Sequence, residues 1–163
     1  MQKFIQKYTI VHTINYFPDG YEFSMEAWPI HVSLADVFSI QGSPNALLEM
    51  LSNELSNYLI IESQVIGEDW FGEDKTVNVM LINKSDKLQS LHETIIDVLE
   101  KFHVIFNAPQ FTLEGFTPHS TVKGKERLHV GDTVYFNSVT LIDMFPNKNP
   151  YRRKVLGTIH FSE

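Results

Sequence analysis

Two short segments of the sequence carry the same pattern of reactive side chains. Each has a histidine, any residue, a hydroxyl residue and an apolar residue, as in His31-Val32-Ser33-Leu34 and His119-Ser120-Thr121-Val122. An imidazole gains or loses a proton near neutral pH, and a hydroxyl donates hydrogen bonds to anionic oxygens. Two such histidines can serve as general base and general acid on opposite sides of a phosphorus atom. The pattern therefore indicates phosphoryl chemistry.

Both segments have strand character, and this determines which side chains point together. Successive side chains on a β-strand face opposite ways. We therefore expect His31 to share a face with Ser33, and His119 to share a face with Thr121. The apolar fourth residue of each motif should pack behind it, into the core. Lys123 is expected on the same strand face as Thr121, within reach of a phosphate.

The pairing of the motifs matters more than either motif alone. With seven histidines in the chain, about one hydroxyl two places after a histidine is expected by accident. Four occur, but the one at His92 lies in a predicted helix and the one at His160 lacks an apolar fourth residue, so both are taken as accidental. A single strand histidine is more often structural than catalytic. We expect structural roles for the histidines outside the pair: His12, His92, His103, His129 and His160.

Composition limits the classes of protein to consider. The chain has 163 residues, no cysteine and a formal net charge of −7. This length fits one two-lobed domain over residues 1–163. The acidic balance disfavours binding to long duplex DNA, and the lack of cysteine fits a reducing compartment. No signal peptide or membrane-spanning run is evident, so we expect a cytoplasmic monomer without a membrane partner.

Hydrophobic periodicity gives the order of the elements. Helix starts are predicted at Ser43-Pro44 and at Ser85, where a serine can cap the first turn. The chain is expected to be extended again from Phe111 to Phe116. The remaining predictions are strands at 4–16, 28–37, 63–70, 76–83, 132–145 and 153–161, helices at 43–59 and 86–102, and a turn at 67–74. This order favours a bilobal α+β fold with mainly antiparallel sheets and outer helices.

The two motif segments, Pro29 to Phe38 and Thr117 to Val122, resemble the paired H-x-T/S-x motifs of the two-histidine phosphoesterase superfamily, which includes 2′-5′ RNA ligase-like proteins and cyclic nucleotide phosphodiesterases. The layout of the predicted elements is similar too. The resemblance implies a pseudo-twofold arrangement around a central cleft. It also implies that His31 and His119 are catalytic.

The activity that follows from this resemblance is metal-independent and needs no cofactor. Ser33 and Thr121 become the phosphate-binding hydroxyls. The substrate is a small nucleotide or an RNA end, and the reaction is hydrolysis of a 2′,3′-cyclic phosphate or the processing or joining of 2′-5′ ends. Two aromatic residues near the motifs, Trp28 and Tyr151, are candidates to stack on a base. Phe38 and Phe116 are better explained as core residues.

A second hypothesis is a non-catalytic module that binds nucleotides or RNA ends on the same fold. The complete motifs favour the enzyme. A Ser-His-acid hydrolase would need a G-x-S-x-G elbow, which is absent, and the sequence has no phosphate-binding G-x-x-x-x-G-K loop. The residues leave open which histidine is the acid and which the base.

Overall fold

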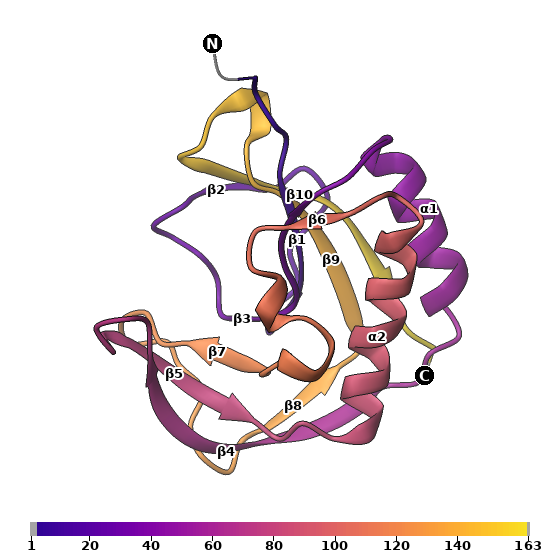
Figure 1. Cartoon of the computed structure of the whole chain (residues 1–163). Helices are drawn as coiled ribbons and strands as arrows, with labels where there is room; N and C mark the ends of the chain where they lie inside the picture. The colour runs from indigo at the N-terminus through magenta and orange to yellow at the C-terminus, as the bar shows by residue number, and fades with distance from the viewer. Residues whose placement is uncertain (1–2, 163) are drawn as a thin grey trace.

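Two antiparallel sheets and two outer helices make up the part of the chain that the structure, a computed structural model, describes: residues 3–162. The larger sheet has six strands in the order β2-β10-β9-β1-β3-β6, and the smaller has four in the order β7-β5-β4-β8 (Figure 1). The larger sheet comprises β1 (Tyr8–Thr13), β2 (Glu22–Ser24), β3 (His31–Ser39), β6 (Ile105–Phe106), β9 (Ser138–Asp143) and β10 (Arg152–His160). The smaller comprises β4 (Ile61–Phe71), β5 (Val77–Ile82), β7 (His119–Thr121) and β8 (Thr133–Phe136). The predicted α+β class is confirmed.

The two helices begin where the sequence predicted. Helix α1 (Pro44–Leu55) is capped by Ser43, whose hydroxyl accepts a hydrogen bond from the Ala46 N–H at 3.1 Å. Helix α2 (Asp86–Glu100) is capped in the same way by Ser85, through the Leu88 N–H at 3.2 Å. Each cap satisfies an N–H that the first turn leaves without a helical partner. No helix among residues 3–162 is long and apolar enough to cross a membrane.

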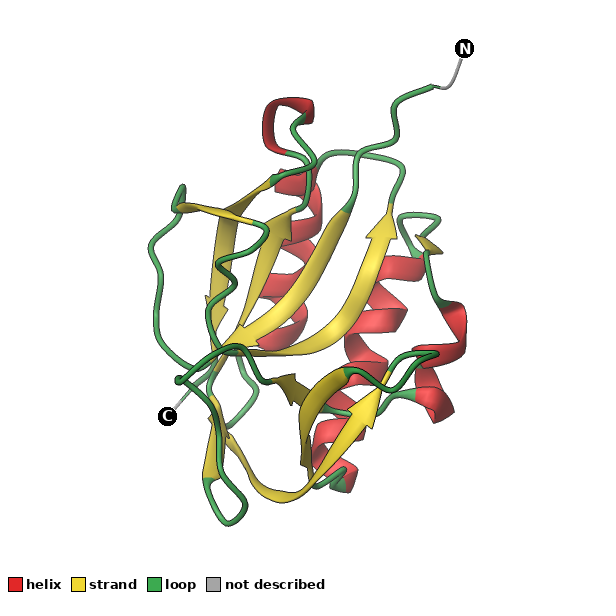
Figure 2. Ribbon diagram, turned by 90° about the vertical axis from the view of Figure 1, so that its left-hand side faces the viewer, coloured by secondary structure: helices red, strands yellow, loops and turns green. Residues whose placement is uncertain are grey.

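The main core lies between the helices and both sheets, with members on β1, β3 and β9 of the larger sheet and on β4, β5 and β8 of the smaller. Figure 2 shows the helices along one face of the larger sheet. Helix α1 presents Leu47, Leu51 and Leu55, all fully buried. Each such leucine contributes about 1.5–3 kcal/mol by leaving water. Gly157 lets α1 lie close to β10, because a Cβ there would lie 2.9 Å from a methyl carbon of Leu48 and would force that side chain to shift.

A smaller apolar cluster covers the opposite face of the larger sheet. Its buried members are Val11, Phe23, Ile142, Met144 and Val155. The ring of Trp28 packs against this cluster from the segment between β2 and β3. The sheet is therefore apolar on both sides, and the second face leads to the residues of the first motif.

Several predicted boundaries are wrong. The first strand runs over 8–13 instead of 4–16, and the second over 31–39 instead of 28–37. Helix α1 ends at Leu55 and not near 59, because serine and asparagine at 56 and 57 readily bond to the backbone in non-helical conformations. Helix α2 ends at Glu100, two residues early. The predicted strand at 132–145 is two strands, divided at Asn137.

Two segments have a different conformation from the predicted one. The turn predicted at 67–74 is strand as far as Phe71, because this stretch forms a ladder with β5. The reversal follows at Gly72, which has φ +96°. The segment 111–116 is not extended but forms short 3-10 turns, η1 (Pro109–Phe111) and η2 (Leu113–Gly115). A third such turn, η3 (Pro146–Lys148), joins β9 to β10.

Candidate active site

Each motif histidine is the first residue of a strand. His31 opens β3 and His119 opens β7, and the two strands contact each other where the two sheets meet (Figure 1). Within β3 the predicted alternation holds: His31 and Ser33 are half-buried, whereas Val32 and Leu34 are fully buried. The faces of the first motif strand are therefore as the sequence predicted.

The second motif has the same alternation on a shorter strand. His119 and Thr121 are half-buried on one face, and Ser120 is 2% exposed on the other. Strand β7 pairs with β5, where Leu81 lies opposite His119 and Val79 opposite Thr121. The apolar fourth residue, Val122, packs against the main core just beyond the strand. The hydroxyl that shares the histidine's face is therefore that of Thr121.

Both histidines are fixed by the same hydrogen bond. His31 Nδ1 lies 2.8 Å from the Pro29 carbonyl oxygen, and His119 Nδ1 lies 2.7 Å from that of Thr117. A carbonyl oxygen only accepts, so each Nδ1 must carry the proton and donate it. In a neutral ring the proton is then on Nδ1, and Nε2 is left with a free lone pair. Among residues 3–162 no hydrogen bond to either Nε2 is present.

The field around His31 is positive although the chain as a whole is acidic. Burial lowers the pKa of His31 below its ordinary value, and the positive charges of Lys123 and His119 lower it further. The hydrogen bond to the Pro29 carbonyl acts in the opposite direction. All three ionisable groups concerned are cationic or neutral, a combination suited to an anionic ligand such as phosphate.

An aromatic ring lies against each histidine. The Trp28 ring is 4.6 Å from the His31 ring between centroids, at 32°, and the Phe71 ring is 4.9 Å from the His119 ring, edge to face at 71°. Trp28 is itself supported by Phe23 and by the Arg153 guanidinium, 5.9 Å above its ring. Trp28 is thus next to the motif, as its selection as a base-stacking candidate requires. Phe71 was missed because the sequence predicted a turn there.

Thr13 was also missed by the sequence reading. It lies directly opposite His31 in the ladder between β1 and β3, so the two side chains share a face. On the same face Thr140 and Thr158 bond to each other through their hydroxyls at 2.9 Å. The face of the first motif therefore continues into buried and half-buried hydroxyl residues. The alternation of β1 alone did not reveal Thr13, because the partner strand of β1 was not known from the sequence.

Lys123 lies just beyond β7 and not on it. Strand β7 ends at Thr121, and Lys123 instead forms an isolated bridge with Glu126 across a tight turn. The side chain is exposed, and its charge still reaches His31. The predicted strand continuation is wrong, but the charge of Lys123 still acts on the pKa of His31.

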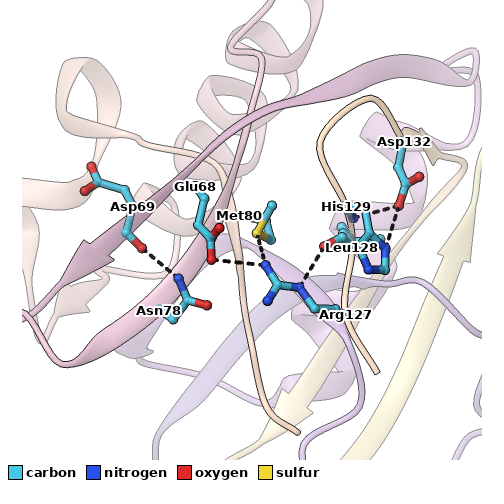
Figure 3. A network of polar contacts seen from close by, with 8 residues as sticks. All are labelled: Glu68, Asp69, Asn78, Met80, Arg127, Leu128, His129 and Asp132. Atoms are coloured by element: carbon cyan, nitrogen blue, oxygen red, sulfur yellow. Dashed lines mark hydrogen bonds and ion pairs between the residues drawn. The ribbon is translucent and has the colours of Figure 1, made fainter. Parts of the chain in front are cut away.

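The loop after this turn is anchored to the smaller sheet by Arg127 (Figure 3). Its guanidinium donates to Glu68 at 3.2 Å and to the Met80 sulfur at 2.9 Å. The Asn78 and Arg127 hydrogen bonds hold the pKa of Glu68 below its usual range. Because Glu68 is exposed, this ion pair adds little to stability. Its geometric effect is to fix one end of the turn that carries Lys123.

The other aromatic residues considered in the sequence do not contribute to the site around the two motif histidines. Tyr151 has an exposed ring, 69% accessible, and its carbonyl accepts a hydrogen bond from the Met25 N–H at 2.9 Å. Among residues 3–162 no hydrogen bond or aromatic pair joins Tyr151 to either motif. Phe38 and Phe116 are buried in the main core, as expected. Within residues 3–162 no group of three or more His, Cys, Asp or Glu side chains is placed to hold a metal ion.

Comparison with known proteins gives a family. The model of the 2′-5′ RNA ligase superfamily matches residues 2–135. The chain belongs to this superfamily. The match includes both motifs, and the superfamily fold supports a phosphoesterase-type function. A comparison with curated protein sequences finds no match.

Solved structures share the superfamily fold at low sequence identity. LigT of E. coli complexed with 3′-AMP is similar with a TM-score of 0.62 at 11% identity, over 98% of this chain and 99% of that one. The same protein complexed with NADP+ has a TM-score of 0.58 at 11% identity, with the same coverage. TT0787 of Thermus thermophilus has a TM-score of 0.60 at 12% identity, over 94% of this chain and 97% of that one. The LigT-like architecture is thus established for this member of the superfamily.

Proposed function

We propose that the protein is a metal-independent phosphoesterase that opens the 2′,3′-cyclic phosphate of a small nucleotide or an RNA end. The observation that carries the proposal is the matched pair of histidines, each with Nδ1 bonded to the carbonyl oxygen two residues earlier. This arrangement supplies two Nε2 atoms for proton transfer beside hydroxyl donors and a lysine.

In the proposed reaction His31 is the base and His119 the acid. The lowered pKa of His31 favours its neutral form, so its Nε2 takes a proton from the attacking water. The water oxygen bonds to phosphorus while the bond from phosphorus to one ribose oxygen breaks. The protonated His119 ring gives its Nε2 proton to that leaving oxygen. The products are a phosphomonoester and a ribose hydroxyl. If a 5′-hydroxyl attacked phosphorus in place of water and the 3′ oxygen left with the proton from His119, the product would be a 2′-5′ link.

Ser33, Thr121 and Lys123 are assigned to the phosphate. The two hydroxyls share faces with the two histidines and can donate to the non-bridging oxygens as charge accumulates on them. Lys123 adds a positive charge close enough to affect His31. Hydroxyl donors act most strongly where water is partly excluded, as it is around the half-buried side chains of Ser33 and Thr121.

The test is turnover of 2′,3′-cyclic mononucleotides and 2′-5′-linked oligonucleotides by the purified protein, with and without EDTA. We expect turnover that survives the chelator. His31→Ala and His119→Ala should each lower kcat by about 100-fold or more. The control is His129→Ala, which changes an exposed histidine of the loop at 128–132. Its kcat should match that of the parent protein.

Three results would count against the proposal. Full turnover by His31→Ala or His119→Ala would remove the assigned pair. Complete loss of activity in EDTA, restored by a divalent ion, would make the reaction metal-dependent. Saturable binding of the same nucleotides without any turnover would favour the non-catalytic binding module.

A further inference from the structure

A third histidine, His92, connects the two motif segments through the core. It lies on α2 and is 1% exposed. Its Nδ1 is 2.6 Å from the carbonyl oxygen of Leu34, and its Nε2 is 2.9 Å from the backbone nitrogen of Leu113. Its ring stacks on that of Phe116, with centroids 4.1 Å apart and planes 2° from parallel. One ring nitrogen of His92 therefore bonds to the first motif, and the other bonds to the segment that precedes the second motif.

The partners of His92 determine its protonation. The Leu34 carbonyl oxygen only accepts, so Nδ1 carries a proton and donates it. The Leu113 N–H only donates, so Nε2 must be unprotonated. His92 is thus held as a single neutral tautomer. Its two bonds are made to Leu34, the fourth residue of the first motif, and to Leu113, six residues before His119.

The segment held by His92 is strained and tightly folded. Leu113 has φ +57°, a left-handed conformation that costs a non-glycine residue about 1–2 kcal/mol. Both of its backbone groups are held from α2, the N–H by His92 and the carbonyl oxygen by the Gln89 side chain at 2.9 Å. Two residues later a Cβ on Gly115 would lie 1.9 Å from the Gln110 carbonyl oxygen, so only glycine fits.

This folded segment sets the direction in which the chain enters β7. Phe116, buried against His92, is followed by Thr117, whose carbonyl oxygen accepts the Nδ1–H of His119. The next carbonyl, that of Pro118, accepts from the Ile82 N–H at 3.0 Å. In Figure 1 the orange chain between α2 and β7 is this segment. A shift of Leu113 or Phe116 would therefore pass directly to the carbonyl that orients His119.

We propose that His92 is a positioning residue that fixes His119 relative to His31 by bonding to the backbone of both motif segments. This inference rests on the proposed function for its kinetic part. Its structural part concerns the orientation of the His119 ring, which does not depend on turnover. A substitution far from the reacting atoms that displaces a catalytic group by about 1 Å can lower the rate roughly 100-fold.

The experiment compares three substitutions with the parent protein. His92→Phe keeps a ring for stacking on Phe116 but removes both hydrogen bonds. His92→Gln supplies one donor and one acceptor and should restore part of the link. Tyr58→Phe is the control, because it removes a hydrogen bond from the same helix, to Thr94 at 2.6 Å, without touching either motif segment. Gln89→Met, which releases only the Leu113 carbonyl, is a milder variant if His92→Phe fails to fold.

Two measurements test the positioning role of His92, and the first does not depend on the proposed phosphoesterase activity. The first is the NMR resonance of the His119 ring, assigned by its loss in His119→Ala. It should move in His92→Phe and Gln89→Met, return toward the parent position in His92→Gln and stay in place in Tyr58→Phe. The second is kcat, which should fall about tenfold or more in His92→Phe with little change in KM. Gln89→Met should show a smaller fall.

The outcomes are distinguishable. An inactive parent protein whose His119 resonance still moves in His92→Phe overturns the phosphoesterase and keeps the positioning role. A His119 resonance unmoved in both His92→Phe and Gln89→Met overturns the positioning role, whatever the activity. Equal losses of kcat in His92→Phe and Tyr58→Phe would also overturn it, because they would reflect a general loss of stability.

Discussion

His31 and His119 make the same hydrogen bond, each from Nδ1 to the carbonyl oxygen two residues earlier, at 2.8 and 2.7 Å. The bond needs a histidine at the start of a strand and a carbonyl that turns back toward it, and both motifs meet this need by placing a proline nearby. Proline fixes φ and keeps the preceding residue extended. Two different sheets thus present two equivalent Nε2 atoms.

The pH dependence of kcat/KM should identify the base. The rate should rise as His31 loses its proton and fall as the acid loses its own, which gives a bell-shaped profile. Because the pKa of His31 is lowered, the rising limb should lie below about pH 6.5. Lys123→Met removes one of the charges that lower this pKa, so the rising limb should move to higher pH. Kinetics at constant ionic strength between pH 5 and 9 provide the measurement.

Lys125→Met is the matched control for this shift. Lys125 is exposed in the same turn, and it is not among the groups that lower the pKa of His31. Its rising limb should coincide with that of the parent protein. Equal shifts in both variants would mean that only the overall charge of the loop matters. A shift to lower pH in Lys123→Met would contradict the assignment of His31 as the base.

The hydroxyls should affect the chemical step more than binding. Ser33→Ala and Thr121→Val each remove one donor to the phosphate and should lower kcat by about 10- to 100-fold. Thr121→Ser keeps the hydroxyl and should retain most of the activity. Ser120→Ala is the control, because Ser120 is adjacent in sequence but buried on the opposite face. If Ser120→Ala loses as much kcat as Thr121→Val, the assignment of faces is wrong.

The motif strands could be predicted because their pattern is local. A period of two is enough to place Val32 and Leu34 in the core and His31 beside Ser33, and caps at Ser43 and Ser85 depend only on the next three residues. These features need no knowledge of the rest of the fold.

The errors arise where distant contacts decide the conformation. Phe71 is in a strand because it pairs with Val77, although its neighbours in sequence are typical of a turn. Leu113 takes a left-handed conformation because α2 holds both its backbone groups. His92 could be predicted to be structural, but not that it links the two motifs, because Leu34 is 58 residues away in sequence.

Trp28 should contribute to nucleotide affinity. Its half-buried ring lies next to His31, and stacking of a base on an aromatic ring is worth about 1–3 kcal/mol. Trp28→Ala should therefore raise KM or Kd for a nucleotide by about fivefold or more, and Trp28→Phe should raise it less. Isothermal titration with 3′-AMP checks this directly. The control is Trp70→Ala. Trp70 is exposed, and because it precedes Phe71 on the same strand its side chain faces away from the side of the sheet on which Phe71 contacts His119.

Stability should fall as the pH drops below neutral, because three buried or half-buried histidines favour the neutral form. Burial lowers the pKa of His12, His31 and His92 below the ordinary value in the folded protein. When unfolded, each binds a proton at about pH 6.5, so between that pH and the lower folded pKa the unfolded state holds more protons. The free energy of unfolding is then unaffected above this window and decreases as the pH falls through it.

Each histidine can contribute a slope of at most about 1.4 kcal/mol per pH unit inside this window. Urea unfolding at pH 8, 7, 6 and 5.5 measures the total. His92→Gln carries no titrating ring, so its slope should be smaller than that of the parent protein, whereas Tyr58→Phe, which leaves every histidine in place, should leave the slope unchanged. Comparing the two variants isolates the contribution of the His92 ring to the slope, because the carboxylates are the same in both. A slope as steep in His92→Gln as in the parent would show that the His92 ring takes up a proton as readily in the folded as in the unfolded state, which its bond from the Leu113 N–H does not allow.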